Sequence, residues 1–501
     1  MLDFDPTTTS PHPDITYGTL SYDSGNRLTE IDYTHSGSTL DDLTWAYDAA
    51  NLVTSFTSSV DGTADYSYDP TNQLTAATYT GTNQPANESY SFDSTGNGTN
   101  TGYTTGTNNQ LTSDGTFNYT FDHAGNRVTR TRISSGQAND YLTAYTWDYR
   151  NRLTDVAYYN NSSVLTKYVH YVYDVYDHLI GTEIDATGSG SYSSSEWYAL
   201  DLAADPNAPA LPVLQFDGSG HETHRYLDAR GANGIITVMA EEAITTQGSA
   251  GTTTYALADN LGTVRDLVNT SSVVVDHIVY NSFGQVAYQS NSAIAHWAGF
   301  AGYHTDAMTG LDYADHRWYD PIVGRWVSED PLGFGGGDTN LSRYVGNGTT
   351  NTVDPEGLRW VIVGYDTNGK PVKKWFWPWE SSAWIEPYGQ PAGTKPTGGG
   401  KPTGGGKPSG ATKPSGTTKP TGTAKPAGST TPGGTTKPEP PEVEVTVEPD
   451  SLTSGHVTIP VASGNGTTVA VTIGGSGNPT VHGKPSPADT PSGNLGLTIN
   501  H

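Results

Sequence analysis

Two short units of the same pattern, Asp-Pro-x-Gly, lie close together in the second half of the chain. They occupy residues 330–333 (Asp-Pro-Leu-Gly) and 354–357 (Asp-Pro-Glu-Gly). Each is first of all a turn, because Asp accepts backbone N–H groups, Pro fixes φ and Gly supplies a conformation that costs other residues. A chemical interpretation is also open: two carboxylates in a partly dry site share a proton, and one acts as base while the other acts as acid. The spacing alone does not select between the two interpretations.

The chain before this stretch is repetitive. An aromatic-Asp pair recurs at intervals of roughly 21 to 29 residues, a period typical of stacked supersecondary units. The pairs are Tyr22-Asp23, Tyr47-Asp48, Tyr68-Asp69, Phe92-Asp93, Phe121-Asp122, Trp147-Asp148 and Tyr173-Asp174. A branched aliphatic residue usually follows, separated from the pair by a turn of Asn, Gly or Asp. The pattern predicts strand, tight turn, strand, with the aromatic and the aliphatic residue facing each other across a hairpin and the Asp bound to turn amides.

A single hairpin is unstable in water, so these units must stack side by side into a larger sheet. The aromatic-Asp pairs fit either a ligand surface or a structural ladder. Their regular recurrence favours the ladder, because a binding site has no need to repeat.

Composition limits the chemistry. The chain of 501 residues has 34% hydrophobic residues and is rich in Gly, Thr, Ser, Asn and Tyr, which indicates β-strands and turns. It contains no Cys, which excludes disulfides and zinc-thiolate sites. His277, His304 and His316 lack metal-ligand spacing, and we expect no metal and no cofactor. The formal net charge of −27 argues against nucleic acid as a partner of the whole chain.

The whole region around the two units resembles the core of the RHS/YD-repeat family. The resemblance rests on Arg-Trp-Tyr-Asp-Pro at 317–321, Gly-Arg-Trp at 324–326, the two Asp-Pro-x-Gly units, and the segment from Asn340 to Asn347. It extends upstream through residues 255–266, 275–280, 283–284 and 309–311. Proteins of this family include the β-shells of bacterial polymorphic toxins, of insecticidal toxin complexes and of teneurins.

The resemblance implies a hollow shell of spiralled β-hairpins that the core closes. In bacterial members the core is an aspartyl autoprotease, which cuts after the Leu that follows the second Asp-Pro-x-Gly unit. Carried over to this chain, Asp330 and Asp354 are the acid/base pair, Arg325 is a supporting cation, and Leu358–Arg359 is the scissile bond. One position departs from the family pattern, since Thr349 stands where Asn-x-Pro would place a proline.

The expected fold is all-β: a stacked β-hairpin spiral that forms a partial or complete shell, then a disordered linker of Lys, Pro, Gly and Thr, then a small β-domain. The expected domains are YD/RHS repeats at 1–185, the repeat-associated core at 186–358, a Trp-rich β segment at 359–389, the linker at 390–441 and the β-domain at 442–501. The linker carries Lys at every sixth position from 395 to 425, and four short alternating runs follow it at 443–447, 457–461, 469–473 and 495–499. The Trp-rich segment fits either an aromatic binding platform or a small segment packed on the shell.

Two functions of different classes remain open. The first is an RHS-type shell protein, secreted or on the cell surface, whose core cleaves itself after Leu358 and frees its own C-terminal segment as cargo. The alternative is a non-cleaving structural or adhesive surface protein that displays the C-terminal β-domain on a spacer and binds a carbohydrate or protein ligand. A fragment of a longer protein is a third interpretation. We expect no transmembrane segment, and residues 1–6 lack the basic and apolar regions of a signal peptide.

Overall fold

The protein is described from a computed structural model. The structure describes residues 15–134, 139–201, 210–230, 236–365 and 371–375, together with three strands near the C-terminus, at 467–474, 479–485 and 496–500. The chain divides into two compact units, Met1–Pro396 and Thr397–His501, which are treated separately below. No helix in the described part of the chain is long and apolar enough to cross a membrane.

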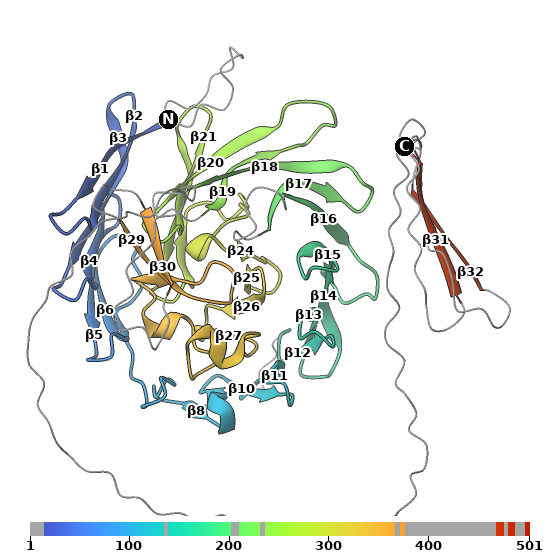
Figure 1. The fold of residues 1–501 in the computed structure, drawn as a ribbon, viewed down its shortest axis with the longest axis horizontal. Helices are drawn as coiled ribbons and strands as arrows, with labels where there is room; N and C mark the ends of the chain where they lie inside the picture. The colour runs from blue at the N-terminus through green and yellow to red at the C-terminus, as the bar shows by residue number, and fades with distance from the viewer. Residues whose placement is uncertain are drawn as a thin grey trace, which may run out of the picture. The chain divides into compact units, whose positions relative to one another are not determined.

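The first unit is built from antiparallel strands, and within each of its sheets every strand pairs with the next one along the chain (Figure 1). The first sheet holds β1 (Ile15–Tyr22), β2 (Leu28–His35), β3 (Ser38–Tyr47), β4 (Val53–Ser58), β5 (Gly62–Tyr68), β6 (Leu74–Gly81) and β7 (Glu88–Ser89). The second sheet holds β8 (Tyr103–Thr105), β9 (Leu111–Asp114), β10 (Phe117–Phe121), β11 (Arg127–Arg132), β12 (Leu142–Trp147), β13 (Leu153–Tyr159), β14 (Leu165–Tyr173), β15 (Leu179–Asp185), β16 (Ser194–Asp201), β17 (Leu211–Asp217), β18 (Glu222–Arg230), β19 (Ile236–Ala243), β20 (Thr252–Ala258), β21 (Val264–Asn269), β22 (Val274–Tyr280) and β23 (Val286–Gln289). The predicted all-β hairpin spiral is confirmed.

The aromatic-Asp turns form as predicted. In all seven, the Asp Oδ1 accepts the backbone N–H groups two and four residues later, as Asp48 does from Ala50 and Leu52 at 2.8 and 2.9 Å. The aromatic residue lies opposite the aliphatic one across the hairpin, as Tyr47 does opposite Val53. These turns are therefore structural, and the side chain fixes the backbone turn that joins the strands.

A second contact links one hairpin to the next. The Tyr47 hydroxyl donates to the carbonyl of Leu28 at 2.6 Å, and the Tyr173 hydroxyl donates to the carbonyl of Leu153 at 2.8 Å. Each ring thus buries its apolar body while its polar end finds a partner in the preceding repeat. This register explains why a Tyr suits the aromatic position in these repeats, although Phe92 and Phe121 occupy it in two others.

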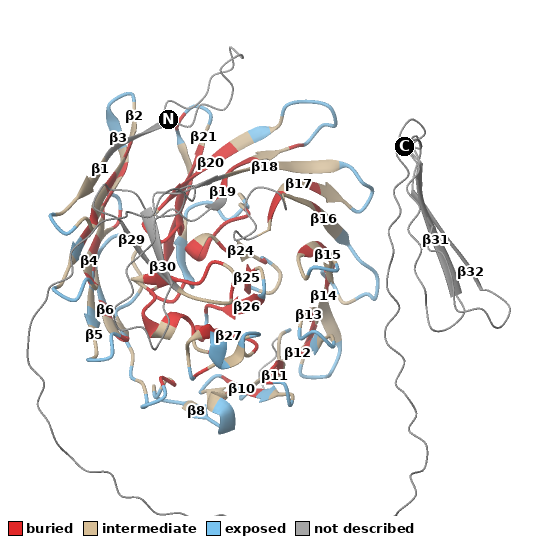
Figure 2. Cartoon of the chain, viewed as in Figure 1, coloured by how far each residue is buried: buried red, intermediate tan, exposed pale blue. Residues whose placement is uncertain are grey.

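Strands β1 to β23 form the wall of the first unit. The core segment, which follows β23 in the chain, lies within the curve of these strands (Figure 1). It contains β24 (His304–Thr305), β25 (Asp312–Ala314), β26 (Arg317–Asp320) and β27 (Arg325–Trp326) in one sheet, and β28 (Thr352–Val353), β29 (Val361–Tyr365) and β30 (Pro371–Trp375) in another. Three short 3-10 helices complete it, η2 (Phe300–Gly302), η3 (Gly333–Gly336) and η4 (Val345–Asn347), and a fourth, η1 (Thr107–Asn109), lies in the wall between β8 and β9. Buried residues concentrate on the inward side of the wall and in this segment, while the hairpin turns at the rim are exposed (Figure 2).

Aromatic packing joins the core segment to itself and to the wall. Tyr319, Trp326 and Tyr344 are almost fully buried and lie against one another, with ring centroids 4.4 to 5.7 Å apart. Trp318 packs on Tyr171 of β14 at 4.4 Å. Such large rings bury much apolar surface each, so they hold the core segment firmly against the sheet.

The predicted domain boundary at residue 185 does not coincide with a break in the sheet. The wall runs without a break across residue 185, and its change of sheet falls between β7 and β8. Within the expected Trp-rich β segment at 359–389, β29 pairs with β30, and β29 also pairs with β28 across the expected cleavage position. In the second unit, β31 (Thr467–Gly474), β32 (Pro479–Pro485) and β33 (Gly496–Asn500) pair with one another. The linker at 390–441 and the runs at 443–447 and 457–461 lie outside the described residues.

Candidate active site

Both Asp-Pro-x-Gly units are turns. At the first, the Gly333 N–H donates to the Asp330 carbonyl at 2.8 Å, and Asp330 Oδ1 accepts the Leu332 N–H at 2.8 Å. At the second, the Gly357 N–H donates to the Asp354 carbonyl at 3.2 Å. The turn interpretation is therefore confirmed, and the remaining question is what the outer carboxylate oxygens contact.

The two carboxylates meet at one guanidinium group. Arg317 Nη2 lies 3.2 Å from Asp330 Oδ2 and 2.9 Å from Asp354 Oδ2. All three side chains are nearly dry, with exposed fractions of 3%, 10% and 2% for Arg317, Asp330 and Asp354. Arg317 also donates from Nε to the carbonyl of Gly357, and its guanidinium lies 4.2 Å from the ring centre of Trp326. This geometry fixes the cation between the carboxylates.

The Leu358–Arg359 peptide bond lies against the same group of side chains. Asp354 Oδ1 accepts the N–H groups of Leu358 and of Arg359, each at 2.9 Å. A Cβ added at Gly336 would lie 2.4 Å from Asp330 Oδ2 and 3.2 Å from the Leu358 carbonyl oxygen. Asp354 is thus at the nitrogen of the bond, and Asp330 and the carbonyl oxygen both border Gly336.

Burial dominates the electrostatics. It raises the pKa of Asp330, a shift that the charge of Asp354 increases and the guanidinium of Arg317 opposes. Burial likewise raises the pKa of Asp354, against the effect of Arg317 and of the two N–H donors. Both carboxyls therefore hold a proton more readily than they would in water, which is the condition for acid/base work near neutral pH.

The sequence selected Arg325 as the supporting cation, and the structure places it elsewhere. Its guanidinium donates to the Asn97 side chain at 3.2 Å, the Asn109 carbonyl at 2.7 Å and the Asn340 side chain at 3.0 Å. Burial lowers the pKa of Arg325 to about 10. The cation between the carboxylates is Arg317, which sequence reasoning missed. Its signal was its place at the head of the Arg-Trp-Tyr-Asp-Pro motif, but each of the two arginines precedes a Trp.

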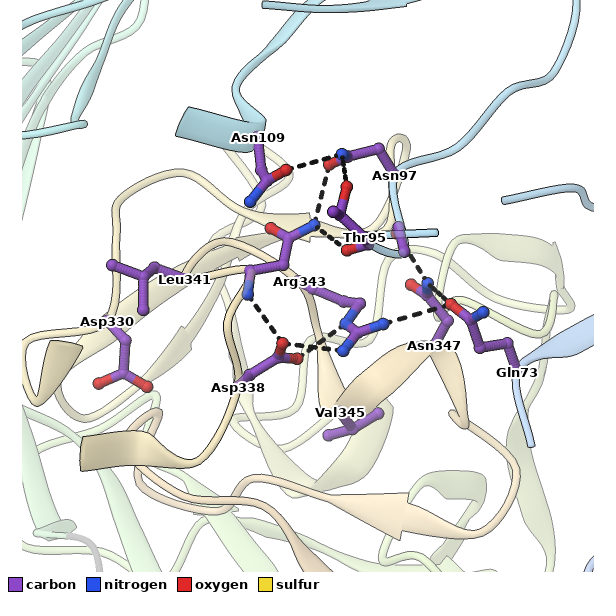
Figure 3. Close-up of polar contacts among 12 residues, drawn as sticks. Gln73, Thr95, Asn97, Asn109, Asp330, Asp338, Leu341, Arg343, Val345 and Asn347 are labelled. Carbon is purple, nitrogen blue, oxygen red and sulfur yellow. Dashed lines mark hydrogen bonds and ion pairs between the residues drawn. The ribbon is translucent and has the colours of Figure 1, made fainter. Parts of the chain in front are cut away.

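Arg325 belongs to a polar network that anchors the core segment on the wall. Figure 3 shows the part of this network around Asn97, Gln73 and Asn347. Asn340 donates to the Asn97 side chain at 2.8 Å and to the Thr95 carbonyl at 3.1 Å. Asn347 donates to the Gln73 side chain at 2.8 Å and to the Gly96 carbonyl at 2.9 Å. Asn340 and Asn347 thus bind hairpin turns of the wall, and they hold the segment between the two Asp-Pro-x-Gly units at two points.

His277, His304 and His316 do not come together with one another as metal ligands would. The described residues contain no group of three or more His, Asp or Glu side chains that could hold a metal ion. His277 binds two aspartates in the wall, and His304 stacks on Trp297 with ring centroids 3.8 Å apart. His316 contacts the Glu356 carbonyl at 3.2 Å, beside the second turn.

Comparison with known proteins shows which families and which proteins this chain is similar to. Two family models match the chain, Teneurin YD-shell over residues 223–336 and RHS Repeat over residues 47–84. The double-stranded DNA deaminase toxin A of Burkholderia cenocepacia (strain H111) is 26% identical over 349 residues, which cover 63% of this chain and 22% of that protein. The probable deoxyribonuclease RhsB of Dickeya dadantii (strain 3937) is 27% identical over 250 residues, 49% of this chain and 16% of that protein.

Among solved structures, the crystal structure of TcdB2-TccC3-TEV superposes with a TM-score of 0.50 at 19% identity, over 68% of this chain and 18% of that chain. The fold is thus a β-hairpin shell of the kind that the structure of that complex contains. The chain thus contains an RHS repeat and a teneurin-type YD-shell region, and it is similar to polymorphic toxins. It spans about a fifth or less of the length of these relatives.

Proposed function

We propose that this shell protein cleaves its own Leu358–Arg359 bond with Asp330 and Asp354. The observation that supports the proposal is the single guanidinium of Arg317 that joins both carboxylates beside that bond. Asp354 acts as the base and Asp330 as the acid. Asp354 is suited to the ionised state, because two N–H groups and Arg317 donate to it, while Asp330 has fewer such partners.

The reaction balances with one water molecule. Asp354 takes a proton from the water, whose oxygen bonds to the carbonyl carbon of Leu358, while Asp330 gives its proton to the carbonyl oxygen. When the tetrahedral intermediate collapses, the carbon–nitrogen bond breaks and Asp354 passes its proton to the nitrogen of Arg359, which lies 2.9 Å from its carboxylate. Asp330 recovers its proton, and the products are a carboxyl group on Leu358 and an amino group on Arg359.

In this function the C-terminal segment is the cargo of a secreted or surface-bound shell. The pairing of β28 with β29 spans the bond, so the segment after Arg359 remains attached by strand pairing until the shell opens. The relatives named as a DNA deaminase toxin and a probable deoxyribonuclease support a released effector as the class of cargo.

Intact mass spectrometry of the purified full chain tests the proposal, with Asp330→Asn and Asp354→Asn as site variants. Asp69→Asn is the matched control, because Asp69 also begins an Asp-Pro turn and accepts two turn amides but lies in the wall. We expect a fragment that begins at Arg359 in the wild type and in the control, and none in the site variants. A single full-length species in all four proteins rejects autoproteolysis and leaves the alternative, a display scaffold that stays whole.

A further inference from the structure

A cavity of about 140 Å³ lies between the wall and the core segment, away from Asp330 and Asp354. Its floor is the inner face of five neighbouring strands, β15 to β19, and its cover is the segment 295–308, which includes β24 (Figure 1). Ala295 and Ala307 at its rim are exposed. The volume is close to that of an engineered protein cavity that holds benzene, so this cavity has room for a small organic molecule.

The strand register places polar residues on this inner face, where apolar ones would be expected. Thr182 pairs with Glu196, and Tyr198 pairs with Gln215. Tyr226 pairs with Glu241 on the next two strands. Partners in register point to the same face, so carboxyl, amide and phenol groups converge on one space. Inward polar residues in a buried sheet usually mark a functional position.

The two glutamates at the cavity, Glu196 and Glu241, have no Lys or Arg partner in its lining. The lining includes Glu196, Glu241 and Asp306 and contains neither Lys nor Arg. Burial raises the pKa of Glu241 to about 7, and the charge of Glu196 adds to the shift. His224 approaches Glu241 only to 3.6 Å, and burial lowers its pKa. Burial also lowers the pKa of His296 and His304, the other two histidines of the lining, to about 4, so they are neutral near pH 7. Glu196 and Glu241 therefore repel each other, whereas the ammonium group of Lys167, which donates to the Met308 carbonyl, offsets the charge of Asp306.

Two polar side chains at the cavity, Gln215 and Glu241, each have an atom that makes no hydrogen bond to a described residue. Gln215 is 8% exposed, and its side-chain oxygen accepts the Tyr226 hydroxyl, whereas its amide nitrogen makes no hydrogen bond within the described part of the chain. Glu241 is 6% exposed, with one oxygen bound to the Trp297 N–H at 3.0 Å. Its other oxygen makes no hydrogen bond to any described residue and has only the 3.6 Å approach of His224. A nearly buried amide and carboxylate that each have an atom without a hydrogen-bond partner at a cavity point to a bound ligand.

We propose that this cavity binds a small organic cation, an ammonium or guanidinium group on a short aliphatic chain. The carboxylates of Glu241 and Glu196 would pair with the positive group by charge-assisted hydrogen bonds. The rings of Trp297, Tyr198 and Tyr226 supply aromatic surface for the aliphatic chain and for cation–π contact.

Calorimetric titration of the full chain tests this with three matched probes: n-butylamine, butylguanidine and the neutral butan-1-ol. We expect both cations to bind, and butan-1-ol to bind at least about tenfold more weakly. Glu241→Gln and Glu196→Gln should each weaken cation binding by about tenfold or more. Glu183→Gln is the control, because Glu183 follows Thr182 on β15 and points to the opposite face.

Two further measurements keep the proposal open to rejection if a variant fails to fold. With the wild type, titration near pH 6.5 in two buffers of different ionisation enthalpy should show net proton release, because the cation favours ionised Glu241. Titration with CaCl₂ should show no binding that depends on Glu241. Equal binding of butan-1-ol and butylamine, absence of cation binding, absence of proton release, or binding of Ca²⁺ in place of the amine would each overturn the proposal.

Discussion

The carboxylate of Asp354 accepts the backbone N–H of Arg359 at 2.9 Å, directly across the turn that Asp354 itself begins. The contact extends the usual Asp turn by one residue, since Leu358 N–H binds the same oxygen. In the wall hairpins the same chemistry only closes a turn, as at Asp48. The turn and the acid/base interpretations are therefore compatible: the hydrogen bonds that form the turn also place a carboxylate on the nitrogen of the peptide bond.

Replacing Arg317 should separate cleavage from folding. Arg317→Lys keeps a positive charge but loses the planar group whose single nitrogen reaches both carboxylates. We expect the rate of appearance of the 359–501 fragment to fall by about 100-fold, the scale of losing one preorganised donor at an active site. Arg325→Lys is the comparison, and because Arg325 binds Asn97 and Asn340 instead, it should lower stability more than cleavage. The reverse ranking of these two variants would mean that Arg317 is only structural.

Gly336 offers a sharper probe, because it makes no polar side-chain contact that a substitution could remove. A methyl group there would lie 2.4 Å from Asp330 Oδ2, closer than atoms tolerate, so Asp330 must move away from the Leu358 carbonyl. Gly335→Ala is the matched control, since its added carbon would meet only Leu332 at 3.9 Å. We expect cleavage, followed by gel electrophoresis over time after expression, to be lost in Gly336→Ala and kept in Gly335→Ala. Full cleavage in Gly336→Ala would show that Asp330 is dispensable.

A buried histidine joins the two wall sheets and should make stability fall at high pH. His277 on β22 contacts Asp61 at 2.8 Å with one ring nitrogen and Asp266 at 2.7 Å with the other. Burial opposes its charge, but the two aspartates outweigh burial and raise its pKa to about 10, from 6.5. The imidazolium therefore stabilises the fold fully below pH 6.5, and this contribution is lost as the pH rises through 10.

The measurement is the midpoint of thermal unfolding between pH 6 and pH 10.5. Wild type should lose stability over this range by a few kcal/mol more than His277→Gln, which has no charge to lose. His221→Gln is the control, because His221 is exposed and contacts only Asp217 of its own turn. Parallel curves for wild type and His277→Gln would show that the imidazole is neutral in the fold.

Local chemistry explains what the sequence could predict. The facing of Tyr47 and Val53 and the binding of Asp48 to turn amides depend on residues within a few positions of each other. Because these local patterns repeat along the chain, the sequence predicted both the hairpins and the stacking of one hairpin on the next. Asn160 and Asn269 close the same turns without being recognised, because the pattern was read as aromatic-Asp and an Asn amide oxygen accepts the same two N–H groups.

Long-range contacts explain which features the sequence could not predict. Arg317 and Arg325 have equivalent neighbours in sequence, and only the fold decides that one meets Asp354 and the other meets Asn97, which lies far away along the chain. The polar floor of the β15–β19 cavity is likewise invisible in any single strand. Each strand contributes one or two residues, and only the register brings Glu196 near Gln215 and Glu241.

The anchor of the core segment on the wall should depend on Asn340 more than on any exposed contact. Asn340 is fully buried, donates to Asn97 and to the Thr95 carbonyl, and accepts from Arg325. Asn340→Ala leaves those partners buried without hydrogen bonds, at a cost of about 1–3 kcal/mol for each neutral group and more for the guanidinium. We expect the free energy of unfolding in urea to fall by about 3 kcal/mol, the size expected when a buried polar network is broken. Asn118→Ala, at an exposed position of β10, should change it by less than about 0.5 kcal/mol. Equal stability of the two variants would show that aromatic packing alone holds the core segment in place.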